Sequence, residues 1–122
     1  MLKLSARPRK QNAKDPAGKR CAPFLKWLRG RECILVNTGE CRGKVRACHW
    51  DEAGAKGVGT KVSDKHSLPM CDGHHAEQGE ILGWPKFQLK YAFRAADATA
   101  FFWNEWLFNT PMGKAWRDRS DG

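Results

Sequence analysis

The chain has no long apolar run, and its first residues lack the apolar stretch of a secretory signal. Residues 1–4 lead directly into Arg7-Pro8-Arg9-Lys10, so no signal peptide is expected. No run approaches the length of a membrane span, and no membrane partner is expected. These absences favour a cytoplasmic protein, in which paired cysteines more often bind metal than each other. The five cysteines of the 122-residue chain are therefore candidate metal ligands.

Acidic residues are almost absent from the first quarter of the chain. Residues 1–31 hold ten Lys or Arg and a single acid, Asp15, and this excess equals the net charge of +9 of the whole chain. A segment so rich in charge and proline cannot bury apolar surface, so residues 1–20 are expected to form a disordered basic arm. Such an arm suits a nucleic-acid backbone, with a solubilising tail as the alternative. Its candidate phosphate-binding residues are Arg7, Arg9, Lys10, Lys19 and Arg20.

Cysteine and histidine occur at spacings that suit a metal ion. Two residues separate Cys71 from His74, as in half of a tetrahedral zinc site, and Cys33 with Cys41 can supply the other half. His75 follows immediately and could exchange roles with His74. A chain of this length buries a modest core, so a structural zinc would add usefully to its stability.

Hydrophobic periodicity predicts a mixed α and β domain. Cys48 alternates away from His49 and is expected to be a buried apolar residue, whereas Cys21 is expected to be a free thiol. The aromatic stretch 95–108 has helical spacing, and residues 111–122 are expected to form a frayed polar tail. The other expected elements are a helix over 22–30, a strand over 32–36 opening a hairpin that presents Cys33 and Cys41, a strand over 44–50, a glycine-rich loop over 54–61, a strand over 67–70, and a helix over 73–82 capped by Asp72.

The order strand, loop, strand, helix indicates a particular kind of site. His49 closes the first strand and His75 lies in the first turn of the helix. If the strands pair and the helix packs across them, both imidazoles face one cleft, which is the layout of ββα-metal nucleases. Their chemistry needs a neutral histidine as general base for a water and a divalent cation at the scissile phosphate.

Several short motifs also resemble a known family in their order along the chain. The small HNH nucleases of phages and prophages carry similar motifs, and the resemblance covers about residues 31–108. It implies an α+β fold, a small zinc-stabilised ββα-metal domain over 21–110 that includes an aromatic-rich C-terminal helix. The motifs that carry it are Ala47-Cys48-His49, Gly57-Val58-Gly59-Thr60-Lys61, Ser63-Asp64, Leu68-Pro69-Met70-Cys71 and His74-His75.

The resemblance implies a role for each matching residue. His49 corresponds to the general base, and His75 to a ligand of the catalytic cation, which would be Mg²⁺, Mn²⁺ or another divalent ion. The residues that correspond to the structural zinc ligands are Cys33, Cys41, Cys71 and His74.

The middle residue of the motif is open between two positions. Asp64 follows the glycine-rich loop and could orient His49 or join the cation, whereas a more generic HNH spacing selects His66. The glycines of that loop would let Lys56 and Lys61 approach DNA phosphates closely.

These expectations describe a metal-dependent HNH-type endonuclease that cleaves DNA in the bacterial cytoplasm, with recombination as one candidate process. Many relatives carry a further histidine four residues after the paired histidines, where this chain has Gly79. That departure favours the alternative, a catalytically silent zinc-bound module that binds DNA or assists recombination. DNA is the expected partner in either case, and surplus aromatic surface on the C-terminal helix could form a homodimer contact. Duplex, single-stranded and branched DNA all remain open as substrates.

Overall fold

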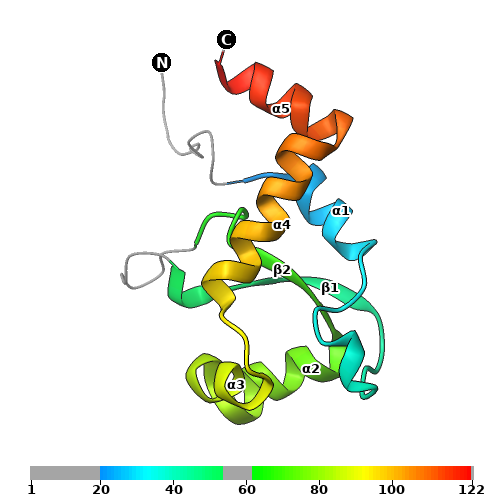
Figure 1. Ribbon diagram of the computed structural model, residues 1–122, viewed down its shortest axis with the longest axis vertical. Helices are drawn as coiled ribbons and strands as arrows, with labels where there is room; N and C mark the ends of the chain where they lie inside the picture. Colours follow the sequence, from blue (N-terminus) through cyan, green and yellow to red (C-terminus); the bar gives the residue numbers. More distant parts are fainter. Residues whose placement is uncertain (1–19, 54–61, 122) are drawn as a thin grey trace, which may run out of the picture.

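The computed structural model describes residues 20–53 and 62–121 (Figure 1). It is a small α+β fold in which helices pack around one antiparallel sheet of two strands. Its elements are, in chain order, α1 (Ala22–Arg29), the 3-10 helix Val36–Thr38, β1 (Val45–His49), the 3-10 helix Asp51–Ala53, β2 (Ser67–Cys71), α2 (Asp72–Ala76), the π-helical segment Glu77–Leu82, α3 (Gly83–Tyr91), α4 (Ala95–Asn109) and α5 (Pro111–Asp121).

The register of the hairpin places Cys71 and His49 at opposite ends of the sheet. Val45 pairs with Cys71 at one end, and His49 pairs with Ser67 at the other. Four residue steps of about 3.4 Å separate these ends, so Cys71 and His49 lie roughly 14 Å apart along the ribbon. β2 is buried throughout because α1, α2 and α4 all pack against it.

The strands expected on either side of the glycine-rich loop are confirmed, as are the first helix and the aromatic helix. Two apolar clusters hold them together. In one cluster Phe24 of α1 is fully buried against Trp106 of α4. The other joins β2 to α3 through Met70 and Phe87, which are also fully buried. The hairpin is thus fixed from both sides by helices that lie far away in the sequence.

The cysteine loop between α1 and β1 contains no strand, which corrects the prediction for 32–36. Its N–H groups form turns: Val36 N donates to Cys33 O at 2.9 Å, and Thr38 N donates to Leu35 O at 2.9 Å. The loop is tied to β2 by a bond from Ile34 N to Pro69 O at 3.1 Å. Residues 32–36 therefore form turns around Cys33 instead of a β-strand.

The helix after β2 begins and ends differently from the prediction. Cys71, not Asp72, is the N-cap, and its sulfur accepts the N–H of His74 at 3.4 Å. The Asp72 carboxylate instead binds Arg46 Nε at 2.8 Å across the hairpin. One continuous helix over 73–82 is replaced by α2 and the π-helical segment. The segment ends at Gly83, whose φ of 75° lies in the left-handed region that favours glycine.

Residues 111–121 form a helix, so the prediction of a frayed tail was wrong. Thr110 is the residue before α5, and its hydroxyl accepts the N–H of Gly113 at 3.0 Å, while Pro111 occupies the first position. Trp116 anchors the helix by packing against Trp106. This Thr-Pro start and the later tryptophan were visible in the sequence, but the polar composition of the segment outweighed them in the prediction.

Gly113 allows α4 and α5 to approach closely, and we expect Gly113→Ala to destabilise the protein. An added Cβ would lie 1.9 Å from the Trp106 carbonyl oxygen and 2.7 Å from the Leu107 Cα, so the backbones must separate. Such overpacking typically lowers the free energy of unfolding by about 1–3 kcal/mol. Chemical denaturation of the two proteins measures the difference.

Gly79→Ala is the matched control for this substitution. Apart from its chain neighbours and the backbone of its own helix, no heavy atom of the described residues lies within 4 Å of a Cβ at this position. Alanine also has the higher helix propensity, so Gly79→Ala should be neutral or stabilise the protein by up to about 1 kcal/mol. Equal effects of the two substitutions would contradict a close approach at Gly113.

Candidate metal centre and the His49–Asp64 pair

Four side chains converge where the cysteine loop meets β2 and α2. They contribute one ligand atom each, and these atoms all lie within 4.8 Å of one another. His74 Nδ1 lies 3.2 Å from the sulfur of Cys71, 3.7 Å from that of Cys33 and 3.8 Å from that of Cys41. Metal–ligand bonds of about 2.0–2.3 Å in a tetrahedron place neighbouring ligand atoms about 3.5–3.8 Å apart. The cluster Cys33, Cys41, Cys71 and His74 can therefore hold a metal ion, as predicted.

Backbone N–H groups donate hydrogen bonds to two of the sulfur atoms in the cluster. Leu35 N donates to the Cys33 sulfur at 3.4 Å, just as His74 N donates to Cys71 at the start of α2. Burial opposes ionisation of Cys71, but hydrogen bonds from the backbone of His74 and Arg42 outweigh it and lower the pKa of Cys71 to about 6. Burial raises the pKa of Cys33. Cys71 thus ionises more readily than Cys33 and Cys41, and a bound cation would favour ionisation of all three thiols.

The far side of His74 is held by residues that the sequence did not single out. With a metal ion on Nδ1, Nε2 would carry the hydrogen, and it lies 3.5 Å from the hydroxyl of Thr38. The Tyr91 ring lies nearly perpendicular to the imidazole, at 5.3 Å between ring centres and 87° between planes. The Tyr91 hydroxyl in turn donates to Glu77 at 2.5 Å. Such outer contacts fix the orientation of a metal-binding histidine.

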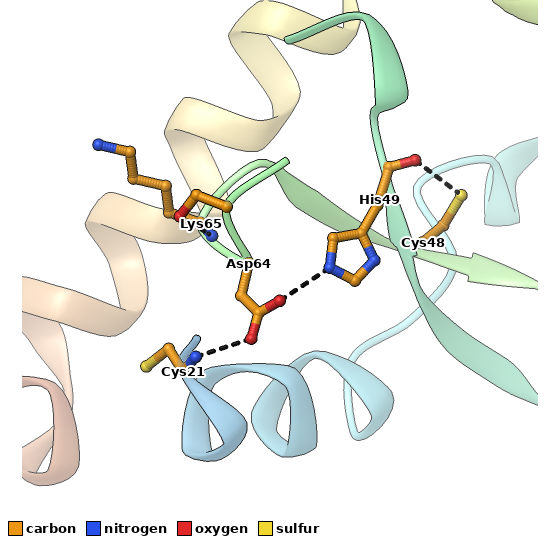
Figure 2. Close-up of polar contacts among 6 residues, drawn as sticks. Cys21, Cys48, His49, Asp64 and Lys65 are labelled. Carbon is orange, nitrogen blue, oxygen red and sulfur yellow. Dashed lines mark hydrogen bonds and ion pairs between the residues drawn. The ribbon is translucent and has the colours of Figure 1, made fainter. Parts of the chain in front are cut away.

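A second polar contact joins the end of β1 to the residues that precede β2. His49 Nε2 lies 2.9 Å from Asp64 Oδ1, and the other carboxylate oxygen accepts the N–H of Cys21 at 2.7 Å (Figure 2). Asp64 is 14% exposed and His49 is 35% exposed. The pair is therefore half-buried, with the imidazole more open to solvent than the carboxylate.

His66, the alternative to Asp64, forms no hydrogen bond or ion pair with His49 in the described part of the chain. Its backbone is used in the turn before β2, where its N–H donates to Ser63 O at 3.0 Å and its carbonyl accepts from Trp50 N at 2.8 Å. Burial and the neighbouring Lys65 lower the pKa of its imidazole. Asp64 is thus the residue that the structure brings to His49.

His75 belongs to neither the metal cluster nor the His49–Asp64 pair. Its side chain is half-buried, and its charge is among the influences that lower the pKa of Asp72, after the hydrogen bonds from Arg46 and the backbone of Lys44. Across 20–53 and 62–121, a single group of three or more potential ligand side chains comes together, and it includes neither His75 nor Asp64. The residues expected to bind the catalytic cation, His75 and Asp64, are therefore not brought together in one ligand group.

Both cysteines outside the metal cluster are buried, and one of the expected DNA-binding residues lies among the described residues. Cys48 is buried, as predicted, and burial raises its pKa to about 12. Cys21 is a free thiol but is also buried. Among the candidate phosphate-binding residues, Arg20 is exposed. The others lie outside the described residues, namely Arg7, Arg9, Lys10, Lys19, Lys56 and Lys61.

Comparison with known proteins identifies no relative. No family model matches the chain, and neither a curated protein nor a solved structure is significantly similar to it. None of the helices in the described residues is long and apolar enough to cross a membrane. The functional argument therefore depends on the site itself.

Proposed function

We propose that this protein is a metal-dependent HNH-type endonuclease that cleaves phosphodiester bonds in DNA. The observation that carries the proposal is the His49–Asp64 pair, a half-buried imidazole fixed by a carboxylate at the end of a β-hairpin. The opposite end of the same hairpin contributes Cys71 to the metal cluster. The first 31 residues, which include the basic arm, account for the whole net charge of +9 and support DNA as the substrate.

Zinc is the ion that we assign to the Cys₃His cluster. Three thiolates and one imidazole in a closed tetrahedral set are typical of structural zinc sites. An ion there would tie the cysteine loop, β2 and α2 together, because each contributes at least one ligand. Its proposed role is to hold the hairpin in place and not to take part in the reaction.

His49 is the proposed general base. Nε2 faces a carboxylate, so it carries the hydrogen and donates it to Asp64, and Nδ1 keeps its lone pair. That lone pair would take the proton from the water that attacks the phosphate. With a third of its surface exposed, the ring is accessible to such a water.

Asp64 is assigned to the orientation of His49 and not to the cation. Each of its carboxylate oxygens already accepts a hydrogen bond, one from His49 and one from the backbone of Cys21. His75 remains the proposed ligand of a divalent cation, Mg²⁺ or Mn²⁺, which would stabilise negative charge on the phosphate when bound.

The alternative is a catalytically silent zinc-bound module that binds DNA. It is favoured by the single ligand cluster in the described residues and by Gly79 at the position where many HNH nucleases carry another histidine. The two proposals differ in cation-dependent cleavage and share DNA binding. Incubation of the protein with supercoiled plasmid and single-stranded circles in Mg²⁺, Mn²⁺ and Ni²⁺ separates them. No cleavage with any ion, beside salt-sensitive DNA binding, would establish the silent module.

Asp64→Asn is expected to lower kcat by roughly 10²–10⁴-fold while leaving KM nearly unchanged. An amide N–H facing Nε2 favours the tautomer with its hydrogen on Nδ1, which removes the lone pair of the base. Asp51→Asn is the matched control, because Asp51 is an exposed carboxylate two residues after His49. Initial rates of plasmid nicking over a range of DNA concentrations measure both constants. A rise in KM with unchanged kcat would contradict the orienting role.

A further inference from the structure

The corner between α4 and α5 carries two arginine–aromatic pairs. The Arg117 guanidinium lies 4.7 Å from the centre of the Phe108 ring, and that of Arg119 lies 4.2 Å from the Trp116 ring. Arg117 Nε also donates to the carbonyl of Leu107 at 3.1 Å. Ring stacking and this bond orient the guanidinium planes in advance, which reduces the entropy lost when they bind an anion.

Cations outnumber acidic residues at this corner. Lys114, Arg117 and Arg119 all lie on α5. Asp118 lies between the two arginines in the sequence and is exposed, but none of the ion pairs among the described side chains involves Lys114, Arg117 or Arg119. A guanidinium carries several N–H donors, and the bond to Leu107 uses one of those on Arg117. The corner therefore has donors suited to phosphate oxygens.

Apolar side chains are exposed beside these charges. Phe108 is 57% exposed and Met112 is 58% exposed, whereas Trp106, two residues before Phe108, is buried. A DNA duplex presents phosphates but hides the faces of its bases inside the stack. A single strand presents phosphates together with unstacked bases, which stack on aromatic side chains and arginine planes. The mixture of cations and apolar surface therefore fits a single strand better than a duplex.

The corner adjoins the point where the basic arm enters the domain. Trp116 packs against the cluster that contains Cys21. Burial raises the pKa of the Cys21 thiol, and the nearby charge of Arg119 opposes that rise. Figure 1 shows α5 at the end of the molecule where α1 begins. Arg20, the last residue of the arm, is exposed and directly precedes Cys21, so it joins the domain near Arg119.

We propose that the α4–α5 corner, formed by Phe108, Met112, Lys114, Arg117 and Arg119, binds single-stranded DNA. The cations contact phosphates, while Phe108 and the outer faces of the guanidinium groups receive unstacked bases. This inference rests on the proposed function for the identity of the polymer. It deepens that function by naming the form of the substrate, DNA with an unpaired strand.

The test measures binding in the absence of cleavage, using the full-length chain with His49→Ala as the background. In this background, Arg117→Gln/Arg119→Gln is compared with Lys86→Gln/Arg94→Gln, which removes the same charge from exposed positions in α3 and before α4. Fluorescence anisotropy with labelled oligo-dT and with a duplex gives Kd over a series of salt concentrations. The first pair should weaken oligo-dT binding on the order of 10-fold and reduce the salt slope by about 1.4. The control pair should change Kd less than about 2-fold.

Three results would overturn the proposal. If the control pair loses as much affinity for oligo-dT, only the net charge of the protein matters. If the arginine variant loses as much affinity for the duplex as for oligo-dT, the corner contacts phosphates alone. Sedimentation showing that the variant dissociates a dimer would assign the corner to a second copy of the chain.

Arg117→Lys/Arg119→Lys decides the question if the glutamine variant does not fold, because it keeps the charge and should weaken oligo-dT binding without altering the salt slope. Absence of cleavage by the unaltered protein would remove the endonuclease proposal and leave this binding result standing.

Discussion

Replacement of Cys71 by alanine is expected to abolish stoichiometric metal binding and to unfold the half of the protein around β2 and α2. Cys71 supplies the sulfur closest to His74, ends β2 and caps α2, so its loss affects three structures together. Loss of a structural metal belongs to the most destabilising class of changes, and we expect the free energy of unfolding to fall by more than about 4 kcal/mol. Metal content by mass spectrometry and denaturation by guanidinium chloride measure the two effects.

Cys48→Ala is the control for the loss of a buried thiol. Cys48 is 2% exposed and Cys71 is 1% exposed, but Cys48 lies outside the metal cluster. Its replacement should leave one metal ion per chain and lower the free energy of unfolding by about 1 kcal/mol. A Cys71→Ala protein that keeps its metal and its stability would show that the cluster is not a metal centre.

His49→Ala is expected to reduce DNA cleavage by roughly 10²–10⁴-fold, which is the range for loss of a general base. The side chain is partly exposed and lies at the end of the hairpin away from Cys71, so the metal content and the fold should be preserved. DNA affinity should also persist, because the basic arm is unchanged. Plasmid nicking rates, metal content and oligonucleotide binding are measured on the same preparation.

His66→Ala distinguishes His49 from a neighbouring histidine. His66 is half-buried next to the same turn, but its imidazole has no described contact with Asp64 or His49. Its removal should leave cleavage within about 3-fold of the parent rate, a change of about 0.7 kcal/mol in the barrier. Equal cleavage by the parent and His49→Ala proteins would reject His49 as the base.

The metal cluster could be predicted from the sequence because its ligands follow local rules. Cys71 and His74 are separated by two residues, which places both at the start of one helix whatever the rest of the fold does. The strand that ends at His49 was equally visible from its alternation. Spacing could not show the path of the cysteine loop, because its turns are set by the need to bring Cys33 and Cys41 to His74.

The His49–Asp64 pair and the position of His75 depend on contacts between residues that are distant in the sequence. They could therefore be predicted less completely than the metal cluster. Asp64 was predicted to orient His49 or to bind a cation, and only the fold shows that its other oxygen receives the N–H of Cys21. The position of His75 depends on how α2 is rotated after β2, and no local motif determines that rotation. α5 was missed because its helical state relies on Trp116 packing against Trp106, a tertiary contact that overrides polar composition.

Both centres require parts of the chain that are synthesised far apart in time. The hydrogen bond from Cys21 to Asp64 spans 43 residues, and the contact of Cys33 with His74 spans 41. A nascent chain therefore lacks the partner of His49 until residue 64 has been made, and lacks a complete metal cluster until residue 74 has been made. If the protein cleaves DNA, a chain truncated before residue 64 would be inert, because neither centre could form.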